Sequence, residues 1–301
     1  MPLLLLLLLL AGCGGEAPPP REFDGRSAFE YIERQLEFGY RIPGTEGHRR
    51  MAAWLDSTVR QKSDSVIIQR WTHVSVKGDS LPLQNVIARY NPGAEKRILF
   101  LAHWDTRPIT DGRLSPDSTK SVMGANDGAS GVAVLLGVAD ILRKAPPSPD
   151  LGVDLLFTDG EDYGDFVKTP EDVVIGARHY AAHQPPGPPP LYAVLFDLVA
   201  DKDLQIYQEG NSLTGAPEVV NLVWDMARDL GYGRIFIDAP NHVLTDDHVE
   251  LQKVGIRAID VVDFDYPAHH TPFDTIDKVS SESLQIVGDV AMGLVRREGG
   301  R

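Results

Sequence analysis

Acidic and imidazole side chains occur in this chain at points where hydrophobic segments end or helices begin. His103 directly follows an apolar run at 97–102, and Asp197 ends another at 192–197. Comparable positions are occupied by Asp127, Glu161, Asp162 and His270. Strand ends hold side chains firmly around a cleft, while the loops that follow leave room for a substrate. This layout is therefore typical of an α/β metal enzyme.

The first two candidates each allow a second interpretation. His103 precedes Asp105 by two residues, so Asp105 can hold the second ring nitrogen while His103 binds a metal; the alternative is a hydrogen-bonded histidine at the sheet edge. Asp127 lies in the small-residue run 124–131, which lets a metal approach closely. Its alternative role is that of a simple N-cap of the following helix.

The remaining candidates are carboxylates and one histidine. Adjacent carboxylates such as Glu161 and Asp162 repel each other unless a cation or a shared proton intervenes, so one is expected to bind metal and the other to transfer protons. Asp197 ends an apolar strand, where a buried carboxylate without a partner is costly. His270 follows the apolar segment 258–264 and a proline turn. The order and placement of all these residues indicate a metal site more strongly than any one of them.

Hydrophobic periodicity predicts the elements that position these residues. Alternating or continuous apolar runs predict strands at 66–71, 85–90, 97–102, 153–157, 192–198, 235–237 and 258–264. Helical spacing predicts helices at 27–38, with Ser27 as a possible cap, and at 47–61, 131–143, 175–183, 218–230, 247–254 and 281–296. This alternation predicts a single α/β domain with a central mixed, mostly parallel β-sheet flanked by helices on both faces, with antiparallel strands at its start.

Composition limits the classes of partner and of ligand. The chain has 301 residues, 43% of them hydrophobic and 24% charged, as in a folded globular protein. Its formal net charge of -14 argues against nucleic acid as a partner. Cys13 is the only cysteine, so the domain that follows forms no internal disulfide and any metal site must use His, Asp and Glu.

The N-terminal segment has the features of an export signal. Leu3 to Leu10 form an apolar run too short to span a bilayer. Leu10-Ala-Gly-Cys13 resembles the bacterial lipobox, which implies cleavage before Cys13 and a lipid anchor in a membrane; an ordinary secretory signal is the alternative. We therefore expect a signal and Pro-rich spacer at 1–20, a catalytic domain at 21–301, and an exported lipoprotein of the bacterial cell envelope, facing the periplasm or the exterior.

Several motifs, taken together, resemble metallopeptidase family 28, the zinc aminopeptidases, and most closely its glutaminyl cyclase branch. They occur in the family's order and are Ala102-His-Trp-Asp-Thr-Arg-Pro108, Gly124-Ala-Asn-Asp-Gly-Ala-Ser-Gly131, Asp159-Gly-Glu-Asp162, Phe196-Asp-Leu-Val199, Thr245-Asp-Asp-His248 and His269-His-Thr271. The resemblance implies the zinc exopeptidase fold, which is phosphorylase/hydrolase-like. It also implies Asp127, Asp162 and His270 as ligands of one Zn²⁺, with Glu161 as general base and acid.

The two branches of the family differ at His103 and Asp197. In the aminopeptidases the matching positions bind a second zinc that Asp127 bridges, and the metal pair activates a water molecule. In the cyclases one zinc suffices, and Asp197 is expected to hold the α-amine of the substrate. The run Thr245–His248 resembles the cyclases, where the residue matching Asp246 joins a hydrogen-bond network with the other acids.

Two positions depart from the cyclase pattern. His269 stands where an aromatic pocket residue is expected, and Phe166 and Val167 occupy the region of an expected tryptophan. The replacement candidates for the pocket wall are Trp104, Tyr163 and Tyr266. The leading hypothesis is a one-zinc glutaminyl-peptide cyclotransferase that acts on peptide or protein N-termini, converting glutamine to pyroglutamate with release of ammonia. The alternatives are a two-zinc aminopeptidase and a non-catalytic binding module.

Overall fold

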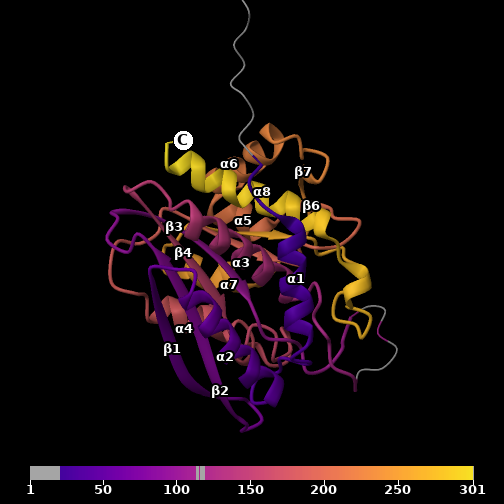
Figure 1. The fold of residues 1–301 in the computed structure, drawn as a ribbon. Helices are drawn as coiled ribbons and strands as arrows, with labels where there is room; N and C mark the ends of the chain where they lie inside the picture. Colours follow the sequence, from indigo (N-terminus) through magenta and orange to yellow (C-terminus); the bar gives the residue numbers. More distant parts are fainter. Residues whose placement is uncertain (1–20, 113–114, 116–118, 301) are drawn as a thin grey trace, which may run out of the picture.

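A six-stranded mixed sheet forms the centre of the molecule (Figure 1). The computed structural model describes residues 21–112, 115 and 119–300; the expected signal and spacer at 1–20 lie outside them. The strand order is β1-β2-β4-β3-β5-β8. The strands are β1 (Ser65–Val74), β2 (Ser80–Tyr90), β3 (Lys96–His103), β4 (Leu151–Thr158), β5 (Ala193–Asp197) and β8 (Ala258–Val262).

The direction of the strands agrees with the predicted arrangement. β1 pairs with β2, and β2 with β4, in antiparallel fashion. The pairs β3 with β4, β3 with β5 and β5 with β8 are parallel. The expected mixed, mostly parallel sheet with antiparallel strands at its start is thus confirmed. Its four parallel strands all end at one edge, which is where chemistry is expected.

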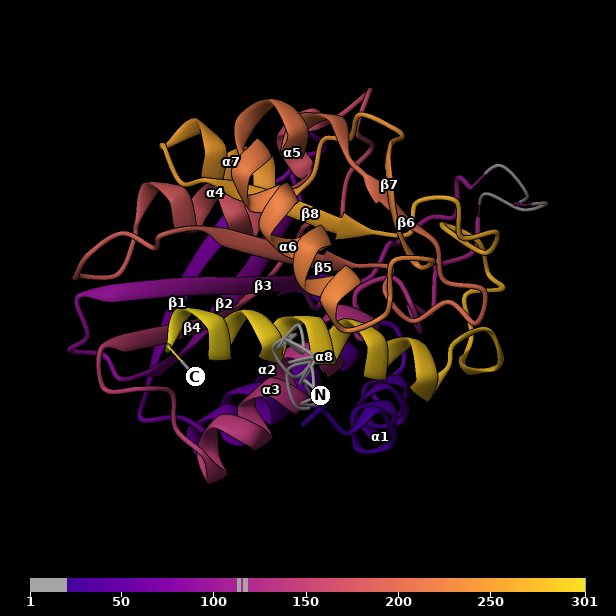
Figure 2. The same ribbon diagram turned by 90° about the horizontal axis from the view of Figure 1, so that it is seen from above.

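Helices cover both faces of this sheet (Figure 2). The helices are α1 (Gly25–Leu36), α2 (Glu46–Arg60), α3 (Ala129–Lys144), α4 (Ile175–Ala182), α5 (Gly210–Gly215), α6 (Pro217–Asp229), α7 (Asp247–Lys253) and α8 (Ser281–Glu298). Helices α1, α2, α3 and α8 pack on one face, and α4 and α7 on the other. In β3, Ile98 and Phe100 face the first layer, whereas Leu99 and Leu101 face the second, as the period of a strand requires.

Some local predictions are wrong. Asp24, not Ser27, caps α1, because the helix begins at Gly25; the Asp24 carboxylate accepts the N–H groups of Arg26 and Ser27 at 3.1 Å each. The short strand β6 (Ile206–Gln208), which was not predicted, pairs in parallel with β7 (Phe236–Pro240). β6 was missed because its three residues are too few to show a period. β7 overlaps the strand predicted at 235–237. No helix in the described ranges is long and apolar enough to cross a membrane.

Candidate metal centre and catalytic site

The predicted site residues gather at the carboxyl ends of the four parallel strands. His103 and Asp197 are the last residues of β3 and β5. Glu161 and Asp162 follow β4 after a tight turn, Asp127 precedes α3, and the loop after β8 carries the sixth residue, His270. Strand ends that lie far apart in the sequence meet at this edge because the strands are parallel. These six residues therefore lie around a common centre, and the seventh predicted residue, Asp246, caps α7.

Asp127 stands between two histidines. Its Oδ1 atom is 3.3 Å from Nε2 of His103, and its Oδ2 atom is 3.7 Å from Nε2 of His270. The same nitrogen of His103 is 3.2 Å from Oδ1 of Asp197, while that of His270 is 3.4 Å from Oδ1 of Asp162. Two groups of metal-binding atoms thus share the carboxylate of Asp127.

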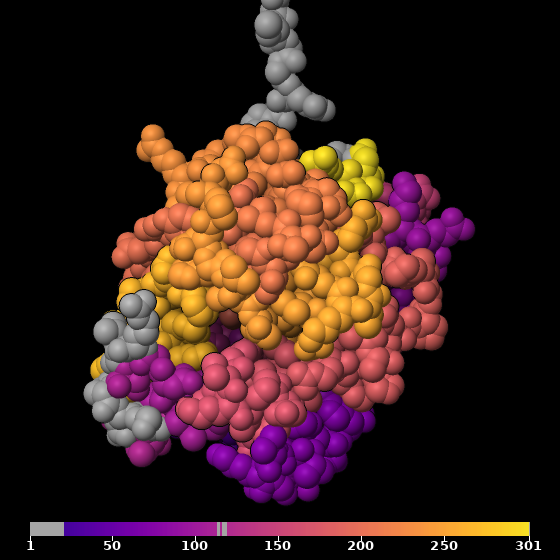
Figure 3. Space-filling view, turned by 180° about the vertical axis from the view of Figure 1, so that it is seen from behind, coloured from indigo at the N-terminus to yellow at the C-terminus, as the bar shows by residue number. Residues whose placement is uncertain are grey.

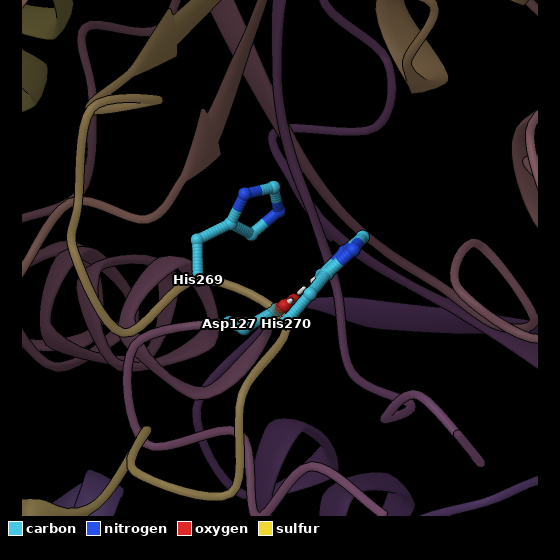
Figure 4. A group of neighbouring side chains, drawn as sticks. All are labelled: Asp127, His269 and His270. Atoms are coloured by element: carbon cyan, nitrogen blue, oxygen red, sulfur yellow. Dashed lines mark ion pairs between the residues drawn. The ribbon is translucent and has the colours of Figure 1, made fainter. Parts of the chain in front are cut away.

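The donor set fits zinc. Oδ2 of Asp127 and Oδ2 of Asp162 are buried and have no hydrogen-bond partner among the described residues. Burying a carboxylate oxygen without a partner is costly, and a bound cation would provide that partner. Carboxylate oxygen and imidazole nitrogen are zinc ligands. Ligand atoms of His103, Asp127 and Asp197 lie within 4.8 Å of one another, as do those of Asp127, His269 and His270 (Figure 4).

His269 is a neighbour that the sequence did not assign to the metal. Its ring packs edge-on against Phe264, with ring centroids 4.9 Å apart, and lies beside His270 at 3.8 Å. Burial and the charge of His270 lower the pKa of His269 to about 3. A neutral imidazole keeps a nitrogen lone pair free, so His269 could bind a metal ion together with Asp127 and His270.

The backbone on either side of the Asp127 carboxylate, at Gly128 and at His270, is conformationally constrained. Gly128 has a φ of 84°, and a Cβ atom there would lie 2.8 Å from the carbonyl oxygen of Asp105. His270 adopts a φ of 54°, which a residue other than glycine holds only when its surroundings enforce it. The buried Asp274 accepts the N–H group of Asp127 at 3.0 Å and so fixes this loop. Asp274 was missed because it lies in an irregular loop without strand or helix period.

Asp105 has a different role from the one predicted. Its Oδ1 atom is 3.6 Å from Nδ1 of His103, too far for a hydrogen bond, and that nitrogen has no hydrogen-bond partner in the described part of the chain. Asp105 instead accepts the N–H groups of Glu161 at 3.1 Å and Asp162 at 3.2 Å. It therefore holds the turn that presents the acidic pair.

An ion-pair chain ties Asp162 to His270. Arg107 donates through Nη1 to Asp162 and through Nε to Asp111, the latter at 2.9 Å. Asp111 Oδ1 lies 2.8 Å from Nδ1 of His270 and orients that ring. Burial raises the pKa of Asp162, but Arg107 and His270 outweigh it and hold that pKa well below its usual value. Asp111 thus holds the second ring nitrogen of His270, which is the role that was predicted for Asp105 at His103.

Glu161 lies in a buried group of acids. Burial, together with the charge of Asp246, raises the pKa of Glu161 well above its usual value. Burial and Asp197 do the same for the pKa of Asp246. No direct hydrogen bond joins Glu161, Asp197 and Asp246 within the described ranges, so their coupling is electrostatic rather than the expected hydrogen-bond network. Such a group shares protons, which suits proton transfer.

Asp260 belongs to this acidic group but was not predicted. Both of its carboxylate oxygens are buried, and neither has a hydrogen-bond partner among the described residues. Burial and Asp246 raise the pKa of Asp260 well above its usual value. An aspartate inside the apolar strand β8 was a signal available in the sequence, because charged residues are seldom fully buried without a partner.

The three predicted wall candidates lie in different places. Trp104 is fully buried; its indole N–H donates to the carbonyl oxygen of Gln84 at 3.1 Å, and its ring stacks on His48. The prediction for Trp104 is therefore wrong, because its side chain is held away from the site. Tyr266 is buried and donates to Asp274 at 2.8 Å. Tyr163 packs beside β2 and α4, and Val167 is 88% exposed.

A hollow is visible in the space-filling view, where segments from the middle and the C-terminal part of the chain meet (Figure 3). The parallel sheet, the strand-end carboxylates and the paired histidines define a metal-dependent α/β enzyme. Residues 85–295 match peptidase family M28, and the chain belongs to this family. The family and the fold predicted from the motifs are both confirmed.

Individual relatives fall into both branches of the family. Porphyromonas gingivalis glutaminyl cyclase is 35% identical with a TM-score of 0.86, and the match covers 92% of this chain and 98% of that one. A Zn-dependent exopeptidase from Parabacteroides distasonis is 32% identical with a TM-score of 0.87, covering 93% and 99% of the two chains. The mouse glutaminyl-peptide cyclotransferase-like protein is 25% identical over 266 residues, which are 78% of this chain and 66% of the mouse protein.

Proposed function

We propose that this protein is a zinc-dependent glutaminyl-peptide cyclotransferase that converts N-terminal glutamine of peptides or proteins to pyroglutamate. The observation that carries the proposal is the buried acidic group, because Glu161, Asp246 and Asp260 are each less than a tenth exposed. Buried acids with raised pKa values can accept and donate a proton, so Glu161 can move one between two nitrogens of a single substrate without a water molecule. The likeness to solved glutaminyl cyclases supports the same assignment.

The proposed reaction needs one proton to move between two atoms of the substrate. Asp127, Asp162 and His270 would hold the zinc, which when bound polarises the γ-amide carbonyl. The α-amine attacks the γ-carbon, and Glu161 accepts a proton from that amine. Glu161 then donates the proton to the departing amide nitrogen as the carbon–nitrogen bond breaks, so ammonia leaves. Asp197 holds the attacking amine, and Asp246 keeps the proton within the acidic pair.

A two-zinc aminopeptidase is the second candidate. The two oxygens of Asp127 face His103 and His270 separately, as a bridging ligand between two metals would. His103 and Asp197 would complete the second site. The likeness to a Zn-dependent exopeptidase favours this reading.

One experiment separates these candidates. The zinc-loaded protein is incubated with a peptide that begins with glutamine, and the products are analysed by mass spectrometry. A cyclase yields the whole peptide lacking ammonia, whereas an aminopeptidase yields free glutamine and a shortened peptide. The same peptide with an acetylated α-amine has no nucleophile and must remain unchanged. An unchanged free peptide at high enzyme concentration would contradict both enzymes and favour a non-catalytic binding module. Counting zinc in the same sample gives one or two ions per chain.

We also propose that the mature protein is an exported lipoprotein of the bacterial cell envelope, anchored through Cys13. The apolar run from Leu3 to Leu10 and the likeness of Leu10-Ala-Gly-Cys13 to a lipobox support this. The test is incorporation of labelled palmitate in a bacterial host. Cys13→Ser must abolish the label and release the protein from the membrane fraction; a wild-type protein without label would contradict the anchor.

A further inference from the structure

Arg107 occupies a buried position between two loops of the metal centre. Its side chain is 4% exposed and donates to Asp162 through Nη1 and to Asp111 through Nε and Nη2. Phe166 covers the guanidinium, with its ring centroid 5.9 Å away. Arg107 comes from the segment after β3, Asp162 from the turn after β4, and His270 from the loop after β8. Arg107 therefore joins the first two segments directly, and its partner Asp111 joins the third through His270.

The contacts of Arg107 and Asp111 leave one metal-binding atom free on each of two ligands. Asp162 gives Oδ1 to Arg107, so its buried Oδ2 remains without a hydrogen-bond partner among the described residues. His270 gives Nδ1 to Asp111, so its Nε2 faces Asp127 and Asp162. Side-chain rotation about these two ligands is thereby restricted before a metal binds.

We propose that Arg107 is a positioning residue that presets two zinc ligands, Asp162 directly and His270 through Asp111. The proposal rests on these residues being ligands, as in the proposed function, but not on which reaction they serve. A planar guanidinium reaches both carboxylates at once, whereas the point charge of a lysine cannot make both forks. Arg107 and Asp111 carry opposite charges, so the pair adds little net charge beside the metal. Orientation is therefore its main effect on zinc binding.

The test measures zinc affinity rather than turnover. Arg107→Met, Arg107→Lys and Asp111→Asn are compared with wild type by competition against a chromophoric zinc chelator. Loss of such an outer contact weakens metal binding by about 10- to 100-fold. We expect this loss in Arg107→Met, with little rescue in Arg107→Lys. Asp111→Asn removes one of the two carboxylates paired with Arg107 and the charged partner of His270, so it should weaken binding at least as much.

Arg89→Met is the matched control. Arg89 is 7% exposed and pairs with the buried Asp154 at 3.1 Å, away from the metal centre. It should leave zinc affinity within about 2-fold of wild type although it removes a comparable buried pair. Cobalt(II)-substituted protein gives an independent readout, because its visible spectrum reports ligand geometry; we expect a changed spectrum in Arg107→Met and an unchanged one in Arg89→Met.

Wild-type affinity in both Arg107→Met and Asp111→Asn would overturn the proposal. Asp111→Asn alone decides the matter if Arg107→Met does not fold. A wild-type protein that binds zinc but cyclises no glutamine would contradict the proposed function and leave this inference standing. A fully active cyclase whose zinc affinity is insensitive to both substitutions would support the proposed function and overturn this inference.

Discussion

Replacement of Glu209 by Gln should destabilise the protein in a manner that depends on pH. Glu209 precedes α5, and its buried carboxylate accepts the N–H groups of Asn211 at 2.8 Å, Ser212 at 2.7 Å and Leu244 at 2.8 Å. It also lies 3.2 Å from Nε2 of the buried His248. His248 belongs to α7, whose cap is the catalytic candidate Asp246. Glu209 thus supports the helix that carries part of the acidic group.

The magnitude follows from the pKa of Glu209. Burial raises this pKa, but His248 and the backbone N–H groups outweigh it and lower it from 4.5 to about 2. Since one pKa unit corresponds to about 1.4 kcal/mol, this carboxylate contributes on the order of 3 kcal/mol at neutral pH. The folded-state pKa is depressed, so the contribution is present above about pH 4.5 and is lost as the pH falls from there toward 2. An amide cannot take over, because its NH₂ group would face N–H donors.

The assay is urea unfolding of wild type and Glu209→Gln at pH 7 and at pH 3. We expect a difference in the free energy of unfolding of about 2–3 kcal/mol at pH 7, and a clearly smaller difference at pH 3. A difference that is equal at both pH values would refute the electrostatic reasoning and indicate a purely steric effect. A difference below about 0.5 kcal/mol at pH 7 would show that the buried carboxylate is not important for stability.

Three further outcomes are expected. Glu161→Gln should lower the rate of ammonia release about 10²- to 10⁴-fold, because the general base is lost. Its urea midpoint should be equal or higher, since a buried acid beside Asp246 is replaced by a neutral isostere; a normal rate contradicts the assigned role. Gly128→Ala should lower the thermal midpoint, because the new Cβ would lie 2.8 Å from the carbonyl oxygen of Asp105 at a φ of 84°; Gly233→Ala, whose new Cβ would come no closer than 3.9 Å to Arg228, is the control. Removal of zinc by a chelator should abolish turnover, and added zinc should restore it; activity that persists in zinc-free protein would exclude a metal-dependent reaction.

Much of the site could be predicted because it depends on short-range pattern. His103 and Asp197 were found at strand ends because apolar runs mark buried strands, and parallel strands end at one edge. Trp104 was misplaced for a related reason. Successive side chains at a strand end point to opposite sides, so His103 faces the centre while Trp104 is buried against His48.

The sequence by itself determined the α/β class, the acidic and imidazole donors and their order, since these follow from local periodicity and residue chemistry. Only the tertiary structure decided which partners hold the donors in place. Arg107 meets Asp162 across 55 positions of the chain, and Asp111 meets His270 across 159. No local period encodes contacts of that separation; they arise when the packed sheet brings its loops together at one edge.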